Sequence, residues 1–351
     1  MPPDHDRARV SDGDASAPAG PEPEPLNEPR VPPVMQSAMR TLVLDRATAE
    51  VVDAWRRAGV PSVLLKGPAI TRWLYRDAEF RGYADIDLLV PDREVGRAEE
   101  VLRTLGFERH GLETIEGDWP RYSRAWIRSE STINVDLHTT LAGVGVEPDR
   151  LWDVLTEDLE RLSVAGLDVD VLPEAARALV LALHTAKDGS RIAKARHDLG
   201  HAIDRLPRDL WPQTRRLAER LDAVGGLAAG LRLVVPSGAA LADELGLPTD
   251  APLGVAIRLH GGAPPLALGI DWLVTTPGVR GKVRLVIRKI FPPATYLRAW
   301  TPIASRGPLG LVVAYAYRAA WVVWHVPPAV WAWARTRRRS NARETGGHPH
   351  P

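Results

Sequence analysis

Two aspartates separated by one residue, Asp85 and Asp87, are the residues of this sequence best suited to chemistry. They lie in the run Ala84–Val90, whose apolar residues predict a strand. Side chains alternate faces along a strand, so both carboxylates share one face while Ile86 and Leu88 face the core. Like charges this close repel unless a cation lies between them, and oxygen ligands suit Mg²⁺ or Mn²⁺. The spacing favours a divalent metal site, with a solvated strand end carrying two incidental acids as the alternative.

A second predicted strand carries a third acid. In residues 133–138 (INVDLH) apolar and polar residues alternate, which puts Asn134, Asp136 and His138 on one face. If this strand lies beside the first, Asp136 completes a cluster of three carboxylates. Two divalent ions held by three acids can activate an attacking oxygen and stabilise a leaving one in phosphoryl or nucleotidyl transfer. A surface position on a strand is the alternative for Asp136.

A third feature is the turn that joins a predicted strand to a predicted helix at Lys66, Gly67 and Pro68. Free backbone N–H groups and the helix dipole make such a junction an anion site, and Lys66 adds a positive charge. The spacing differs from that of a P-loop, and an ordinary turn is the alternative. Arginine forks suit phosphate oxygens, which makes Arg81, between this turn and the acid pair, a further candidate for phosphate binding.

A rival group of residues lies in the second half of the chain. His184 and Lys187 share a face of a predicted helix, while His197, Asp198 and His201 resemble the HExxH spacing with Asp in place of Glu. A zinc hydrolase needs a third ligand and a base of longer reach, and an HD-type phosphohydrolase needs a final aspartate. Packed or solvated helix residues are therefore favoured, with Lys187 as a candidate to support a bound nucleotide.

The elements that must position these residues form a small mixed sheet followed by a helical region, an α+β class. In chain order the sequence predicts a helix at 35–58, strands at 62–65 and 85–90 with a helix at 68–75 between them, a helix at 93–105, paired strands at 121–128 and 132–138, a helix from 151 and a hairpin at 164–167. Nearly everything after Pro173 reads as helix. The fold class therefore combines a sheet that can carry acids with helices that can cover it.

Composition divides the chain further. Residues 1–34 hold nine prolines and little apolar periodicity, which predicts a disordered leader without the features of a secretory signal, so the cytoplasm is expected. Residues 35–172 form the sheet-bearing domain, residues 173–334 a helical domain, and residues 335–351 a basic flexible tail. The absence of cysteine excludes disulfides and cysteine-ligated metals.

The near-zero net charge hides an uneven distribution. Residues 251–351 carry 14 Lys and Arg and two acids, whereas residues 1–250 carry a balance of −11. The apolar stretch Leu309–Val326 is interrupted by Arg318 and is followed by two prolines, so a packed C-terminal helix is favoured over a membrane span. Contact of residues 309–339 with a membrane surface is the less favoured alternative.

Three segments together resemble a known family: LLKGPAI at 64–70, LYRDAEFRGYADIDLLV at 74–90 and NVDLHTTL at 134–141. They look like the nucleotidyltransferase-like proteins of the DNA polymerase β superfamily, in its poorly characterised family 5 branch. The resemblance implies a minimal nucleotidyltransferase fold over the sheet-bearing domain. It also implies that members tend to occur near genes for peptide natural products.

The resemblance also assigns roles to single residues. Asp85 and Asp87 match the metal-binding pair of the superfamily, Asp136 the third acid, and Gly67 the glycine after the first strand. The wider superfamily usually has Gly-Ser there, so the hydroxyl that commonly contacts phosphate is absent from this chain, a departure shared with the family 5 branch. Lys66 and Arg81 are the expected substitutes.

The activity expected from the resemblance is a Mg²⁺- or Mn²⁺-dependent transfer of a nucleoside monophosphate from an NTP, such as ATP, to an acceptor hydroxyl, with release of pyrophosphate. The acceptor is unknown, and a small molecule, peptide or protein is expected rather than RNA. A catalytically weak scaffold or adaptor with a basic, membrane- or partner-binding C-terminal region is one alternative. An Asp-x-Asp glycosyltransferase is another, although only one evident strand precedes Asp85 where that fold needs a larger nucleotide-binding unit.

Overall fold

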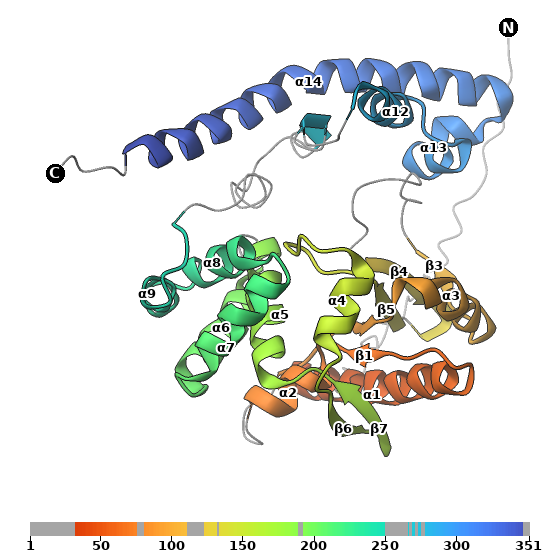
Figure 1. The fold of residues 1–351 in the computed structure, drawn as a ribbon. Coiled ribbons are helices and arrows are strands. Elements are labelled where there is room, and N and C mark those ends of the chain that lie inside the picture. Colours follow the sequence, from red (N-terminus) through yellow and green to blue (C-terminus); the bar gives the residue numbers. More distant parts are fainter. Residues whose placement is uncertain are drawn as a thin grey trace, which may run out of the picture.

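The computed structural model describes residues 32–75, 81–110, 123–131, 133–188, 192–249 and 278–346, with a few positions between 266 and 274 (Figure 1). Of the expected leader at 1–34, all but the last residues lie outside these ranges. The first described element is the helix α1 (Pro33–Arg57), and it begins with proline, whose missing N–H needs no partner at that position.

A seven-stranded mixed sheet, in the order β3-β4-β5-β2-β1-β7-β6, lies at the centre of the first half of the chain. Its strands are β1 (Val63–Leu64), β2 (Ile86–Leu89), β3 (Glu108–Arg109), β4 (Ser123–Arg128), β5 (Ile133–His138), β6 (Glu160–Val164) and β7 (Leu167–Val171). The pairs β2/β5 and β1/β7 are parallel and the remaining pairs are antiparallel. The predicted α+β class, with a small mixed sheet and flanking helices, is confirmed.

The alternation of side chains along the strands separates two faces of the sheet. Leu64 of β1 and Leu88 of β2 enter a core shared with the helices α1 and α3 (Val95–Thr104). Val63 and Leu89 enter the opposite core, shared with the helices of the second half of the chain. Asp87 therefore points to the same side as Leu89, toward those helices. The alternation of residues along β2 thus determines that the acidic side chains face the helices of the second half of the chain.

The core under α1 and α3 holds the first face of the sheet rigidly. Trp55 of α1 is fully buried, and its indole Nε1 donates a hydrogen bond to the carbonyl oxygen of Ala98 in α3, at 3.0 Å. Phe107 and Trp126 complete this layer of large side chains. The buried indole therefore packs while its polar atom remains satisfied.

Helices cover the other face of the sheet, and the helix α5 lies at their centre (Figure 1). They are α2 (Pro68–Leu74), α4 (Pro148–Leu155), α5 (Glu174–Asp188), α6 (Ala193–Arg205), α7 (Leu210–Arg220), α8 (Val224–Arg232) and α9 (Ser237–Glu244). Their apolar core is continuous with Val63, Leu65 and Leu89 of the sheet region. The sheet and the helical layer thus share one core, and a domain boundary at residue 172 stays a prediction.

Three further helices, α12 (Val279–Ile290), α13 (Ala294–Trp300) and α14 (Gly307–Gly346), end the described chain, and α12 and α13 both pack against α14 (Figure 1). The predicted C-terminal helix is present and packs against α12 and α13, but most of its apolar surface is exposed, which the sequence did not predict. Among the described residues, Gly307–Arg335 is the one helix long and apolar enough to cross a membrane, and only 17% of its most apolar window is buried. The apolar stretch predicted the helix, but its burial depends on neighbours that the sequence does not reveal.

The helix α14 also continues further than the sequence predicts. Pro327 and Pro328 lie inside it, and residues 335–346, expected as a flexible tail, are helical. The prolines remove two backbone donors, which leaves the carbonyls of Val323 and Trp324 without their usual intrahelical bonds. The side chains of these two residues are 71% and 81% exposed, so water can reach this part of the helix.

Two glycines allow α8 to approach α5 closely. A Cβ on Gly226 would lie 2.6 Å from Cδ2 of Leu183, and a Cβ on Gly230 would overlap the carbonyl of Ala182. This carbonyl belongs to the main chain of α5, in the middle of a buried helix. It therefore cannot move aside as the end of a flexible side chain could. The position of α5 over the sheet therefore depends on the small size of these residues.

We expect Gly230→Ala to lower the free energy of unfolding by about 1–3 kcal/mol, because overpacking forces α8 away from α5. Chemical denaturation of the full chain measures the change. The matched control is Gly96→Ala in α3, where an added Cβ meets nothing within 4 Å. That variant should keep or slightly raise stability, since alanine favours a helix over glycine. Equal loss in both variants would contradict the packing explanation.

Candidate functional site

The parallel pairing of β2 and β5 brings the predicted acids together. Asp87 lies directly opposite Asp136 in the register of the two strands. Ligand atoms of Asp87, Asp136 and His138 all lie within 4.8 Å of one another, a spacing that can hold a metal ion. Asp85 immediately precedes β2 and is close enough for its charge to act on Lys66, but it is not among the three residues whose ligand atoms cluster. The predicted adjacency of the two acidic strands is confirmed.

Asp87 is almost completely buried and is held by two partners. Lys66 Nζ lies 2.7 Å from Asp87 Oδ1, and His138 Nε2 lies 3.1 Å from the same oxygen. Lys66 reaches this point because it follows β1, the strand that pairs with β2 on the side away from β5. The loop lysine and the strand histidine thus approach Asp87 from its two neighbours in the sheet.

His138 was not predicted as a site residue. It stands two positions after Asp136 in the same alternating strand, so the pattern that selected Asp136 applied to it equally. Its other ring nitrogen, Nδ1, is buried and has no hydrogen-bond partner among the described residues. The imidazole therefore faces the acids with one nitrogen while the second stays unsatisfied.

Electrostatics show an excess of negative charge on the acidic face. Burial and the Asp87 carboxylate raise the pKa of both Asp85 and Asp136. Burial would also raise the pKa of Asp87, but Lys66 and His138 hold it well below its usual value. Burial lowers the pKa of Lys66, yet the nearby acids outweigh burial and raise it. Lys66 thus compensates Asp87, while Asp85 and Asp136 retain repulsion that a divalent cation could relieve.

The helix α5 supplies the opposite wall of the site. A small pocket beside the acids is lined by Lys66, His138, Leu141, Ala142, Val180, Leu183, His184 and Lys187. Burial and the charge of Lys66 lower the pKa of His184 to about 4, so its imidazole is neutral at neutral pH. The charge of Lys187 acts on Asp136. The structure places Lys187, a predicted nucleotide-binding residue, in this pocket together with His184, which was assigned to a rival site.

Gly67 has a backbone conformation that requires glycine, with φ of 61° and ψ of −120°. The backbone N–H groups that were expected to be free for an anion mostly have partners already, however. Pro68 has no N–H, and the N–H groups of Ala69 and Ile70 donate to the carbonyls of Lys66 and Gly67. Since α2 has seven residues, its dipole is also short. The positive charge at this junction comes from Lys66 rather than from the backbone.

The guanidinium of Arg81 is already occupied by other groups. It makes a bidentate pair with Asp198 of α6 at 2.8 and 2.6 Å, and it also donates to Thr71 Oγ1 at 3.1 Å. The hydroxyl of Tyr75 donates to the same Asp198 at 2.5 Å. The guanidinium that was expected to contact phosphate is therefore paired with Asp198, a residue distant in sequence, and its phosphate contact stays a prediction.

The same contacts explain the HExxH-like segment. Asp198 pairs with Arg81 and Tyr75, while the rings of His197 and His201 lie 4.3 Å apart and His201 stacks on Tyr75 at 4.9 Å. Within the described ranges, the group of acids and histidines spaced to hold a metal is the one on β2 and β5. The packed-helix interpretation of this segment fits the structure, and the zinc interpretation does not.

Comparison with known proteins identifies the family. A family model described as uncharacterised nucleotidyltransferase matches residues 33–235, more than half of the chain. The chain belongs to this nucleotidyltransferase family. The match spans the acidic strands, Lys66 and the helix α5, so the whole site lies within it. A search of curated proteins finds no match.

Solved structures of nucleotidyltransferases are similar to parts of the chain at low identity. ANT(2″)-Ia in complex with adenylyl-2″-tobramycin is 15% identical, with a TM-score of 0.37, covering 51% of this chain and 97% of its own. A solution structure of the antibiotic-resistance factor ANT(2″)-Ia is also 15% identical, with a TM-score of 0.31, covering 60% and 94%. An antigenic nucleotidyltransferase-like protein from Paracoccidioides brasiliensis is 16% identical, with a TM-score of 0.33, covering 53% and 92%.

The buried pair of Arg81 and Asp198 generates a stability prediction. Asp198→Asn leaves the guanidinium without its counter-charge and should lower the free energy of unfolding by about 3 kcal/mol at neutral pH. The control is Asp204→Asn on the same helix, at an exposed position, which should change stability by less than about 0.5 kcal/mol. Denaturant titration of both variants measures the difference.

The pH dependence of that difference follows from the pKa of Asp198. Burial would raise this pKa, but the hydrogen bonds and charge of Arg81 hold it below its usual value. A carboxylate with a lowered folded pKa stabilises fully above its unfolded pKa of about 4, and this contribution disappears as the pH falls through the folded value. The gap between wild type and Asp198→Asn should thus be constant near pH 6 and shrink below about pH 4. A gap that widened in acid would contradict the ion pair.

The acidic face leads to a prediction about metal binding. We expect wild-type protein to bind Mn²⁺ and Asp136→Asn to bind it at least about tenfold more weakly, because one of the oxygen ligands loses its charge. Isothermal titration calorimetry measures both affinities. Asp168→Asn is the matched control, since Asp168 is an exposed acid on β7 of the same sheet. Similar Mn²⁺ affinity in all three proteins would show that this acidic face is not a metal site.

Proposed function

We propose that the protein is a divalent-metal-dependent nucleotidyltransferase that transfers a nucleoside monophosphate from an NTP to an acceptor hydroxyl. The observation that carries this proposal is the parallel register of β2 and β5, which sets Asp87 opposite Asp136. Membership of a nucleotidyltransferase family supports the same chemistry. The acids, the lysines beside them and the family thus favour one reaction class.

The residues present fit a divalent cation. Asp87, Asp136 and His138 are close enough to share one, and Asp85 precedes β2 two positions before Asp87. Burial and the neighbouring Asp87 carboxylate raise the pKa of Asp85 and Asp136, and a bound cation would relieve the like-charge part of this effect. When bound, Mg²⁺ or Mn²⁺ supplies charge neutralisation for the phosphates and for the departing pyrophosphate. The mixed oxygen and nitrogen donors suit Mn²⁺ as well as Mg²⁺.

The proposed transfer accounts for each bond that forms or breaks and for the proton that is released. The acceptor oxygen forms a bond to the α-phosphorus, the bond from that phosphorus to the bridging oxygen of the β-phosphate breaks, and pyrophosphate leaves. Asp136 is the carboxylate suited to accept the hydroxyl proton, because it lies opposite Asp87 on the neighbouring parallel strand β5. Asp85 and Asp87 are assigned to hold the cation.

Two lysines of the pocket are placed to neutralise the negative charge of a bound triphosphate. Lys66 and Lys187 line the same pocket from opposite sides, one from the sheet and one from α5. Their ammonium groups would neutralise phosphate charge, while the neutral imidazole of His184 can donate or accept a hydrogen bond without adding charge. Most of the rate enhancement then comes from positioning and charge neutralisation. Gly67 contributes by allowing the chain to turn directly after Lys66.

The fold also bears on the glycosyltransferase alternative. In the described chain, the strand β1 is the only one before Asp85, and it pairs antiparallel with β2. A larger unit of parallel strands before the acid pair, which a nucleotide-sugar site of that kind needs, is not seen in the described residues. Nucleotidyl transfer is therefore the better-supported use of these acids.

The test is transfer by the full-length protein with Mg²⁺ or Mn²⁺, each NTP and small-molecule and peptide extracts, followed by mass spectrometry. We expect products heavier by one nucleoside monophosphate, formed together with pyrophosphate. Asp87→Asn should reduce their formation at least about 100-fold, because it removes a group that holds the cation. The control Asp53→Asn on α1, where the partly exposed carboxylate pairs with Arg57, should leave product formation unchanged. Products that persist in Asp87→Asn would contradict the assigned role of the acids.

A further inference from the structure

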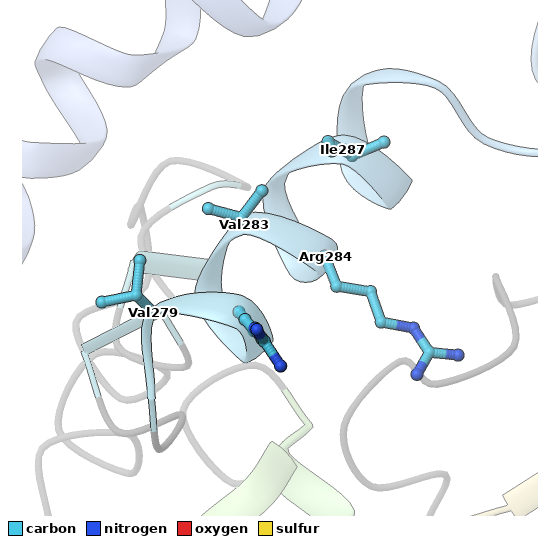
Figure 2. Close-up of a pocket in the computed structure, with 5 residues that line it drawn as sticks. Val279, Val283, Arg284 and Ile287 are labelled. Carbon is cyan, nitrogen blue, oxygen red and sulfur yellow. The ribbon is translucent and has the colours of Figure 1, made fainter.

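The helix α12 carries an apolar stripe that no described part of the protein covers. Val279, Val283 and Ile287 follow one another at intervals of four residues and are 77%, 50% and 53% exposed. Figure 2 shows these three side chains along one side of the helix, with Arg284 extending away from them. Arg280 and Arg284 border the stripe and line a shallow groove together with it. An exposed apolar stripe flanked by cations is typical of helices that lie in a lipid interface.

The helix α14 repeats this pattern over a greater length. Its large apolar side chains with more than half of their surface exposed are Leu309, Val312, Val313, Val323, Trp324 and Trp331. Between Leu309 and Ala334 the only Lys, Arg, Asp or Glu is Arg318, which is buried. Its guanidinium lies over the rings of Trp300 and Trp321, 4.9 Å from each centroid. The exposed face of α14 is therefore free of ionised side chains over this length.

The charges around these faces have one sign. Residues 278–346 contain thirteen Lys and Arg and a single acid, Glu344. Five of the cations are on α12, and a basic run at 335–339 follows the apolar part of α14. A second copy of the chain would bring these cations against their own equivalents, because a two-fold interface pairs the same surface with itself. An anionic surface complements both the charge and the exposed apolar side chains.

The packing of α14 favours lying on a membrane over crossing it. The helices α12 and α13 both contact α14, and Tyr315 of α14 donates a hydrogen bond to the carbonyl of Pro292 at 2.7 Å. Arg318 is enclosed by aromatic side chains from α13 and α14. Insertion of α14 across a bilayer would separate these contacts and expose Arg318 to lipid, which is costly.

We propose that α12 and α14 bind the surface of an anionic lipid bilayer, with the apolar stripe of α12 and the uncharged face of α14 entering the interface. The flanking arginines and lysines contact the lipid phosphates. This attachment leaves the site on β2 and β5 to do its chemistry at a membrane surface. It goes beyond the transfer reaction and does not depend on it.

The test is flotation of the full-length protein with vesicles of equal parts phosphatidylglycerol and phosphatidylcholine, compared with vesicles of phosphatidylcholine alone. We expect binding to the anionic vesicles that weakens as NaCl is raised, and little binding to the neutral ones. The double variant Val283→Glu/Ile287→Glu and the single variant Trp324→Glu should each weaken binding at least about tenfold. Leu42→Glu on α1, a matched change at a position 69% exposed, should bind as wild type does.

A second double variant tests the contribution of the arginines separately from that of the apolar stripe. Arg280→Gln/Arg284→Gln leaves the apolar stripe intact, and it should reduce both the binding to anionic vesicles and its dependence on salt. Circular dichroism and Mn²⁺ titration confirm that each variant keeps its fold and its acidic face. Three results would overturn the proposal: wild-type protein that does not float, protein that self-associates through this face instead, or protein that resists extraction by alkaline carbonate as a spanning helix does.

Discussion

The repulsion between the carboxylates of Asp87 and Asp136 is the constraint on which the rest of the structure depends. The parallel register of β2 and β5 places them opposite each other, and the burial of Asp87 limits the water that would weaken their repulsion. Lys66 and His138 both contact Oδ1 of Asp87, which compensates one carboxylate and leaves the others in need of a cation. A buried arrangement this unfavourable without a ligand is typical of a functional site. The residues proposed to hold the metal are thus the same residues whose carboxylates repel each other.

The fold turns this face of the sheet toward the helical layer. Alternation in β1 and β2 turns Leu64 and Leu88 toward α1 and the acids toward α5. The helix α5 then brings His184 and Lys187 over the acids, and its own position depends on the contact with Gly230 of α8. The sheet region therefore supplies the acids and Lys66, whereas the helical layer supplies Lys187 and the opposite wall of the pocket. This division explains why the family match extends across both parts of the chain.

The acids, their shared face and the α+β class were predictable from the sequence, because alternation along a strand is a local property that does not need the fold. The contact of His138 with Asp87 was not, since it depends on which strand pairs with β2 and in which register. Arg81 illustrates a longer-range limit: its type suits phosphate, but the fold brings it to Asp198, 117 positions away. The exposed face of α14 was misjudged for a similar reason, because an apolar helix is buried only where other elements cover it.

The central claim is that the face formed by Asp85, Asp87 and Asp136 holds a divalent cation for nucleotidyl transfer. The most direct measurement is anomalous X-ray diffraction from crystals grown with Mn²⁺ and a non-hydrolysable NTP analogue. The account predicts an anomalous peak at about 2.2 Å from carboxylate oxygens of Asp87 and Asp136, with phosphate oxygens completing the coordination and Lys66 moved from Asp87 to a phosphate. Diffraction that showed the analogue bound elsewhere, with Lys66 still paired to Asp87 and no peak between the two strands, would contradict it.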